Sequence, residues 1–348
     1  MTTDMTTDMI TDPTADPTAG WRSWHLHLAA FGTDVTDRAV ALAVAPVVAR
    51  HATAPGADGG RPWFFIRYWQ GGPHLRLRIR GLDDAEAREV EALLERAVAA
   101  VDAAIPADRR LTERQYADSV GALARTGEGT GSLDAGALRP PGVVRARYEP
   151  ETGRYGGPAL LGLSEHLFHL SSTVALAACR APRSGQKVSA QALAATAVAA
   201  SALPRAEIRP FLESVRDGWA SWARSYAQDG GPARPPGDGG PEATRPDAAR
   251  LDAARLDAAR LDAQAGQLRS AVPELLRLLH EPGPPWDTWA DPLRSAVPAW
   301  SELPGGRERA HGILGSHLHM TANRLGAGAG QEGRLAALLL ELVGSELP

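Results

Sequence analysis

The segment WFFIRYWQGGPHLRLRIRG, residues 63–81, carries the strongest structural pattern in the chain. After the turn at 71–73, apolar and polar residues alternate, with Leu75, Leu77 and Ile79 in one set and His74, Arg76, Arg78 and Arg80 in the other. Successive side chains of a β-strand point to opposite faces, so this alternation predicts a strand with one apolar and one cationic face. The cationic face has two interpretations, a solvated surface or a rigid site for an anion.

Strands and helices are predicted on both sides of this segment. The stretch WRSWHLHLAAF (21–31) alternates in the same way and predicts a half-buried strand, and VVRARY (143–148) predicts another. Helical spacing of apolar residues predicts helices at 35–51, kinked at Pro46, and at 83–105. Further helices are predicted at 158–180, 188–202, 205–227, 306–326 and 331–345. The expected fold class is α+β, a mixed sheet of N-terminal strands packed by a predominantly helical C-terminal half.

Two stretches have too few apolar residues to pack. Residues 1–20 repeat every four positions and are expected to form a disordered tail. Residues 228–265 combine a proline- and glycine-rich stretch with a five-residue repeat. Five residues advance about 140° beyond one helical turn, so the repeated leucines spiral and form no stripe, which favours a solvated low-complexity insert over a partner helix. The domain map is therefore one domain, 21–348, with an insert at 228–265.

Composition limits the classes of binding partner and the cellular compartments that we expect for the protein. The chain has 348 residues, 44% of them hydrophobic, and a net charge of −4, so nothing global favours binding to nucleic acid or to an anionic membrane. No apolar run reaches the roughly 18 residues of a membrane span, and the N-terminus lacks the pattern of a signal peptide. The single cysteine, Cys179, lies in an apolar stretch and is interpreted as a buried thiol. We expect a cytoplasmic location.

Three further motifs contain residues that could carry chemistry. They are YEPETGRYGGP with Arg154 and Tyr155, SEHLFHLSS at 164–172, and GSHLHMTANRLG with Ser316, His319, Asn323 and Arg324. Each also has an ordinary structural interpretation, as a helix-entry loop or as a helix with a buried histidine. The two histidines of SEHLFHLSS are three residues apart, but no HExxH or CxxC pattern accompanies them, so no metal site is predicted.

The residue types of these motifs suit one kind of reaction. Arginine binds both oxygens of a carboxylate through its planar fork and stays charged, and histidine transfers protons near neutral pH. Arg76, Arg78 and Arg154 with His319 would therefore form a site for a carboxylate-bearing substrate that undergoes proton transfer. This chemistry alone does not name the reaction.

Taken in order, WFFIRYWQGGPHLRLRIRG, YEPETGRYGGP and HLHMTANRLG resemble the C-terminal elimination domain of class I lantibiotic dehydratases. This domain also occurs as a free-standing protein in thiopeptide-type peptide-antibiotic biosynthesis. The resemblance covers roughly 21–345 without the insert. It implies a carbon-oxygen lyase that eliminates glutamate from glutamylated Ser or Thr of a precursor peptide, leaving dehydroalanine or dehydrobutyrine, with no metal or organic cofactor.

The resemblance also implies roles and partners. His319, Arg76, Arg78 and Arg154 match the family's catalytic positions, and His74, Arg80, Tyr155, Ser316, Asn323 and Arg324 are expected to contact substrate. The partners would be the leader-bearing precursor peptide and a glutamyl-tRNA-dependent glutamylating enzyme. The leader is expected near the N-terminal strands, with strand addition at 21–28 as one mode. Whether the protein forms a homodimer is left open.

Two other functions remain open at this point. Thiopeptide pyridine synthases have the same fold but join two dehydroalanines in a formal [4+2] cycloaddition, forming the macrocycle and releasing the leader peptide. The filled arginine and histidine positions favour elimination, whereas Ser171-Ser172 departs from the acidic residue that family members often have before the serine. The third hypothesis is a non-catalytic subunit that delivers the precursor.

Overall fold

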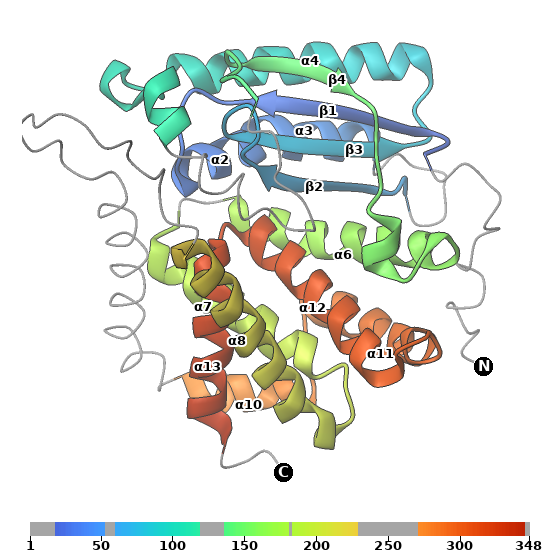
Figure 1. The fold of residues 1–348 in the computed structure, drawn as a ribbon. Coiled ribbons are helices and arrows are strands. Elements are labelled where there is room, and N and C mark those ends of the chain that lie inside the picture. The colour runs from blue at the N-terminus through green and yellow to red at the C-terminus, as the bar shows by residue number, and fades with distance from the viewer. Residues whose placement is uncertain (1–17, 53–59, 119–135, 181–182, 229–270, 345–348) are drawn as a thin grey trace, which may run out of the picture.

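The computed structural model describes residues 18–52, 60–118, 136–180, 183–228 and 271–344. The predicted insert lies outside the described residues except for its first position, and so does the predicted tail up to residue 17. In the described part, a four-stranded sheet formed largely by the N-terminal half lies beside a larger group of helices from the C-terminal half (Figure 1). The predicted α+β class is confirmed.

The sheet is antiparallel throughout, which corrects the expectation of a mixed sheet. Its strands are β1 (Trp21–His27), β2 (Trp63–Tyr68), β3 (His74–Arg80) and β4 (Gly142–Ala146), in the order β2-β3-β1-β4. Strand β1 pairs with β3 on one side and with β4 on the other, so it has no free edge. Strand β1 is therefore not free to take up a leader strand, which corrects the expected mode at 21–28, while the expected position of the leader near the N-terminal strands stays a prediction.

The two faces of β3 differ as the alternation predicts. Leu75, Leu77 and Ile79 are completely buried in the core that the sheet shares with α4 (Asp84–Ala103) and with the helices before β2. On the other face, Arg76, Arg78 and Arg80 of β3 lie directly opposite residues of β1. Their partners in the register are His25, Ser23 and Trp21, respectively. That face points away from α4 (Figure 1) and forms one wall of the site described below.

The predicted helix at 35–51 is interrupted one turn earlier than expected. It consists of α2 (Thr33–Ala39), a five-residue π-helical stretch η1 (Val40–Val44) and α3 (Ala45–His51). Pro46 lies in the first turn of α3, directly after the π-helical stretch, so the irregular turn of the helix coincides with the residue that lacks a backbone N–H. The next helix, α4, begins as predicted, with a capping box between Asp83 and Glu86.

Among its described residues, the C-terminal half contains two helices that the sequence pattern did not predict. Helices α6, α7, α8, α12 and α13 (Leu161–Cys179, Gly185–Ala200, Arg205–Gln228, Gly306–Leu325, Ala329–Val343) agree with prediction within a few residues. The additional ones are α10 (Val272–His280) and α11 (Asp287–Ser301). Prolines inside α11 argue against a helix locally, but its two buried tryptophans, Trp289 and Trp300, fix it in the core. None of the described helices is long and apolar enough to cross a membrane.

Side chains from α6 and α12 satisfy the outer edge of strand β2. The Asn323 amide accepts from the Arg67 N–H at 2.9 Å and donates to the Arg67 carbonyl at 3.0 Å. Arg324 Nε donates to the Phe65 carbonyl at 2.8 Å, and Ser172 Oγ accepts from the Phe65 N–H at 3.3 Å. These bonds replace a fifth strand, so the helices are held in a fixed position against the sheet.

Candidate functional site

A cavity of about 690 Å³ lies between the cationic face of the sheet, the segment 148–155 and helix α12. Its lining combines aromatic residues with the predicted site residues Arg76, Arg78, Tyr155, His319, Asn323 and Arg324. The first two come from β3 and the last three from α12, elements that are more than 220 residues apart in the chain. The fold thus unites two of the three motifs on which the sequence argument rested, and Tyr155 brings in the third.

Arg78 is a buried cation without an anionic partner. It is only 6% exposed, its Nε has no hydrogen-bond partner, and within the described ranges it makes no ion pair. Its guanidinium lies 4.9 Å from the ring centroid of Tyr148 and 5.2 Å from that of Phe64. Burial lowers the pKa of Arg78 to about 10. Glu151 and Glu165 favour its charge only from a distance, without an ion-pair contact in the described residues, so the cavity beside it favours an anionic ligand.

Arg324 is a second buried cation of the same kind. It is 1% exposed, its Nε is used by the Phe65 carbonyl, and one terminal nitrogen, Nη1, has no partner. Its guanidinium lies 5.3 Å from the ring centroid of Phe168, and burial lowers its pKa to about 9. Across the described chain no carboxylate pairs with it. Arg324 therefore both fixes strand β2 and adds positive charge to the cavity.

Arg76 is held in place by His74 and Tyr68. Arg76 Nε donates to His74 Nε2 at 3.1 Å, and the guanidinium lies 3.5 Å from the centroid of the Tyr68 ring. His74 Nδ1 is 2.9 Å from the Gly72 carbonyl, so this nitrogen carries the hydrogen and Nε2 is the acceptor. Burial lowers the pKa of His74 to about 2, which keeps the ring neutral. His74 is buried outside the cavity lining, where it positions Arg76.

His319 is paired with a carboxylate that the sequence did not indicate. His319 Nδ1 lies 2.7 Å from Glu332 Oε1, and both side chains are almost completely buried. The Trp219 ring packs on the imidazole with 5.2 Å between ring centroids. Glu332 is 13 residues after His319 and on the next helix, α13, so no spacing rule within one helix could have found it.

Arg154 and Ser316 lie beside the cavity and contact each other. Arg154 Nε donates to Ser316 Oγ at 3.1 Å, and its Nη1 is 3.3 Å from Glu151 Oε2. The structure thus brings the RYGG motif onto helix α12, as the sequence argument required, but neither residue belongs to the cavity lining. Arg80 is exposed at the end of β3 and also lies outside that lining.

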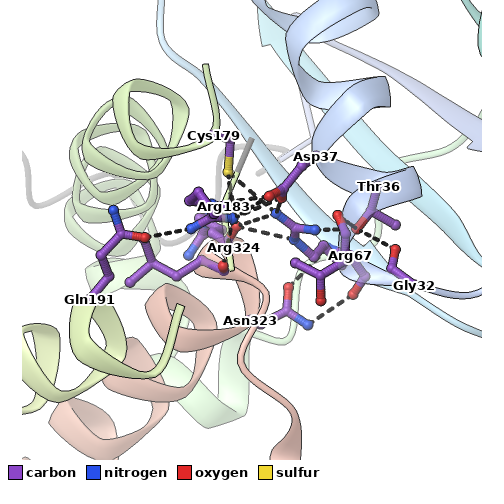
Figure 2. A network of polar contacts seen from close by, with 11 residues as sticks. Gly32, Thr36, Asp37, Arg67, Cys179, Arg183, Gln191, Asn323 and Arg324 are labelled. Atoms are coloured by element: carbon purple, nitrogen blue, oxygen red, sulfur yellow. Dashed lines mark hydrogen bonds and ion pairs between the residues drawn. The ribbon is translucent and has the colours of Figure 1, made fainter. Parts of the chain in front are cut away.

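Asn323 belongs to a polar network that fixes the end of α12 (Figure 2). Asp37 pairs with Arg67 at 2.6 Å and with Arg183 at 2.8 Å. These arginines donate to the carbonyls of Arg324 and of the residue after it, at 3.0 and 2.9 Å. The Asn323 amide bonds the backbone of β2 and so holds α12 against the sheet, while the residue also lines the cavity. Its expected contact with substrate stays a prediction.

The same network surrounds the single cysteine and accounts for its burial. Cys179 Sγ lies 3.3 Å from a terminal nitrogen of Arg67 and 3.2 Å from one of Arg183, and burial raises the pKa of the thiol to about 11. A thiol in this state is a poor nucleophile. The prediction that Cys179 is buried is confirmed.

The SEHLFHLSS segment of α6 contacts the sheet and contains one buried acid, Glu165. His169 and Ser172 contact the backbone of β2, whereas Glu165 accepts from Trp21 Nε1 at 3.2 Å. Burial raises the pKa of Glu165 to about 7. No group of three or more histidine, cysteine or carboxylate side chains that could hold a metal ion occurs among the residues the structure describes.

The arrangement can bind an anion and move a proton. Three arginines, Arg76, Arg78 and Arg324, face one cavity without carboxylate partners in the described structure, and His319 reaches the same cavity backed by Glu332. Guanidinium groups in a low-dielectric pocket stabilise negative charge much more strongly than they do in water. Histidine hydrogen-bonded to a carboxylate is a suitable general acid or base.

Comparison with known proteins gives a consistent assignment. The family model described as "Lantibiotic biosynthesis dehydratase C-term" matches residues 21–343. Among solved structures, the chain is similar to the pyridine synthase TbtD from thiomuracin biosynthesis, at 20% identity and TM-score 0.60, with 93% of this chain and 98% of TbtD covered. A search of curated protein sequences finds no match.

Two other solved structures have the same fold. The tRNA-dependent lantibiotic dehydratase MibB from Microbispora sp. 107891 is 22% identical with a TM-score of 0.50, and the match covers 97% of this chain but only 29% of MibB. TsrL is 16% identical with a TM-score of 0.50, covering 93% of this chain and 95% of TsrL. At these identities the likeness concerns the fold.

Proposed function

Because the chain belongs to the lantibiotic biosynthesis dehydratase C-terminal family, we propose that it modifies a ribosomally made precursor peptide by eliminating glutamate from glutamylated Ser or Thr. The observation that carries the proposal is the cavity in which His319 faces Arg76, Arg78 and Arg324, three cations without carboxylate partners among the described residues. A glutamyl ester supplies the missing negative charge. The partners would be the leader-bearing precursor and a separate glutamylating enzyme that uses glutamyl-tRNA.

The proposed reaction is a β-elimination across the Cα–Cβ bond of the esterified residue. His319 takes the Cα proton, the electron pair forms the Cα=Cβ double bond, and the Cβ–O bond breaks so that glutamate leaves as a carboxylate. Negative charge develops first on the peptide carbonyl and then on the leaving carboxylate. The buried arginines stabilise both, since donors already aimed at the developing charge need no reorganisation during the reaction.

A specific observation supports a second function, the [4+2] cycloaddition. The pyridine synthase TbtD is matched over 98% of its length, whereas the dehydratase MibB is matched over 29% of its length. The matched fold is therefore compatible with either reaction. The unpaired arginines favour elimination, because a substrate that carries two dehydroalanines has no carboxylate leaving group for them to bind.

The test compares two substrates with one protein. Given a glutamylated precursor, wild type should release free glutamate and leave a peptide one water lighter than the unmodified precursor. The His319→Ala variant should accumulate the glutamyl ester, with a loss of about 10²–10⁴-fold. His280→Ala is the matched control, because His280 is an exposed histidine outside the cavity.

The other outcomes each select another function. If wild type leaves glutamyl esters intact but cyclises a peptide with two dehydroalanines, the cycloaddition is correct. If neither peptide reacts while the precursor binds tightly, the protein is a delivery subunit.

A further inference from the structure

The strongest feature that the proposed reaction leaves unexplained is the buried carboxylate behind His319. Glu332 Oε1 and His319 Nδ1 are 2.7 Å apart, and the exposed fractions of the two side chains are 3% and 7%. A carboxylate is expensive to bury unless it has a close partner. Its placement behind His319, which lines the cavity, therefore needs a reason.

The packing of α13 on α8 is built to bring Glu332 to this position. Gly333 is the next residue, and a Cβ atom there would lie 2.8 Å from Trp219 Cβ and 3.4 Å from the Arg216 carbonyl oxygen. Only glycine allows the two helices to approach this closely. Trp219 in turn packs on the His319 ring, so the imidazole is fixed by α8 from one side and by α13 from another.

We propose that Glu332 is a positioning residue that sets the tautomer and orientation of His319. Its carboxylate accepts the Nδ1 hydrogen, so that Nε2 is the nitrogen that exchanges a proton with the substrate. The carboxylate also stabilises the imidazolium that forms after proton removal. The inference rests on the proposed function for its catalytic meaning, whereas the paired state of the ring can be measured without any reaction.

The charges around His319 determine the sign of the expected effect. Besides Glu332, the charged groups that line the cavity are Arg67, Arg76, Arg78, Arg324, Glu149 and Glu151, from β2, β3, α12 and the segment after β4. The arginines disfavour a protonated ring and Glu332 favours it. Removing the Glu332 charge should therefore make His319 titrate at lower pH, by about one unit or more.

The experiment combines a titration with a rate profile. Titration of the His319 ring is followed by NMR in folded protein that carries ¹³C-labelled histidine. The His319 signal is assigned as the one that is missing in H319A. In E332Q the His319 signal should titrate at lower pH than in wild type. The part of the kcat/KM profile that depends on His319 protonation should also shift to lower pH. The kcat should fall about 100-fold with little change in KM, and E332D should recover part of it.

A matched pair elsewhere in the protein provides the control. His311 Nε2 and Glu207 Oε2 are 3.0 Å apart, also between α12 and α8, and neither residue lines the cavity. E207Q should leave the pH profile unchanged. If E332Q folds but neither the NMR titration nor the pH limb moves, the inference is wrong. If wild type does not eliminate glutamate, the proposed function fails, and the NMR arm still decides whether Glu332 controls His319.

Discussion

Replacing Arg78 by methionine should make the protein more stable and nearly inactive. Burial lowers the pKa of Arg78 to about 10, well below the ordinary guanidinium range. One pKa unit corresponds to about 1.4 kcal/mol, so holding this charge in the fold costs about 3 kcal/mol. Methionine has a similar length and removes the charge, and replacing buried charges by apolar side chains often stabilises proteins by about 1–4 kcal/mol.

We expect the free energy of unfolding of Arg78→Met to rise by about 2 kcal/mol and the melting temperature by roughly 5 °C. Elimination should slow by about 10²–10³-fold, since one donor to the developing negative charge is lost. The two quantities are measured by denaturant or thermal unfolding and by mass spectrometry of the glutamylated peptide.

Arg183→Met is the matched control. The Arg183 side chain is fully buried but pairs with Asp37 at 2.8 Å outside the cavity, so its loss should destabilise the fold by about 3–5 kcal/mol (Figure 2). If Arg78→Met proves as destabilising as Arg183→Met, Arg78 has a structural partner in the folded protein. Its interpretation as an anion-binding group would then be wrong.

Three further predictions concern pH, side-chain chemistry and the sheet edge. Burial lowers the pKa values of His74 and His317 to about 2 and about 3, so both rings stay neutral in the fold at pH 5 while they protonate in the unfolded chain. Stability from these two rings is complete above about pH 6.5 and falls by about 2 kcal/mol each between pH 7 and pH 5. Urea unfolding at the two pH values should show a smaller loss in His317→Phe; an identical loss would contradict the assignment. Arg78→Lys should impair elimination almost as much as Arg78→Met, because an ammonium cannot reproduce the guanidinium fork; near-normal turnover would mean that only charge matters. Asn323→Ala should lower the unfolding free energy by about 2–4 kcal/mol by leaving both polar groups of Arg67 unpaired, and a neutral result would mean that water replaces the amide.

The sequence alone determined the elements whose signals are local. The alternation in 74–80 fixed which side chains of β3 face the core, because the period of a strand admits only one assignment once one face is apolar. The capping box at Asp83 and Glu86 likewise fixed the start of α4. Local signals failed at α11, where prolines inside the helix hid an apolar face that only the surrounding core shows.

Which residues form the site, and which partners they have there, depended on the tertiary structure. Arg78 and Arg80 are equivalent in the strand pattern, yet Arg78 is buried and Arg80 is exposed, because the segment after β4 covers Arg78 with Tyr148 and leaves the end of the strand open. Nothing in the sequence indicated that the Asn323 amide bonds the β2 edge, because that strand is more than 250 residues away in the chain. Glu332 meets His319 only because α13 packs on α8 at a glycine. A residue's type and period are local properties, whereas its burial and partners depend on which distant segments the fold brings to it.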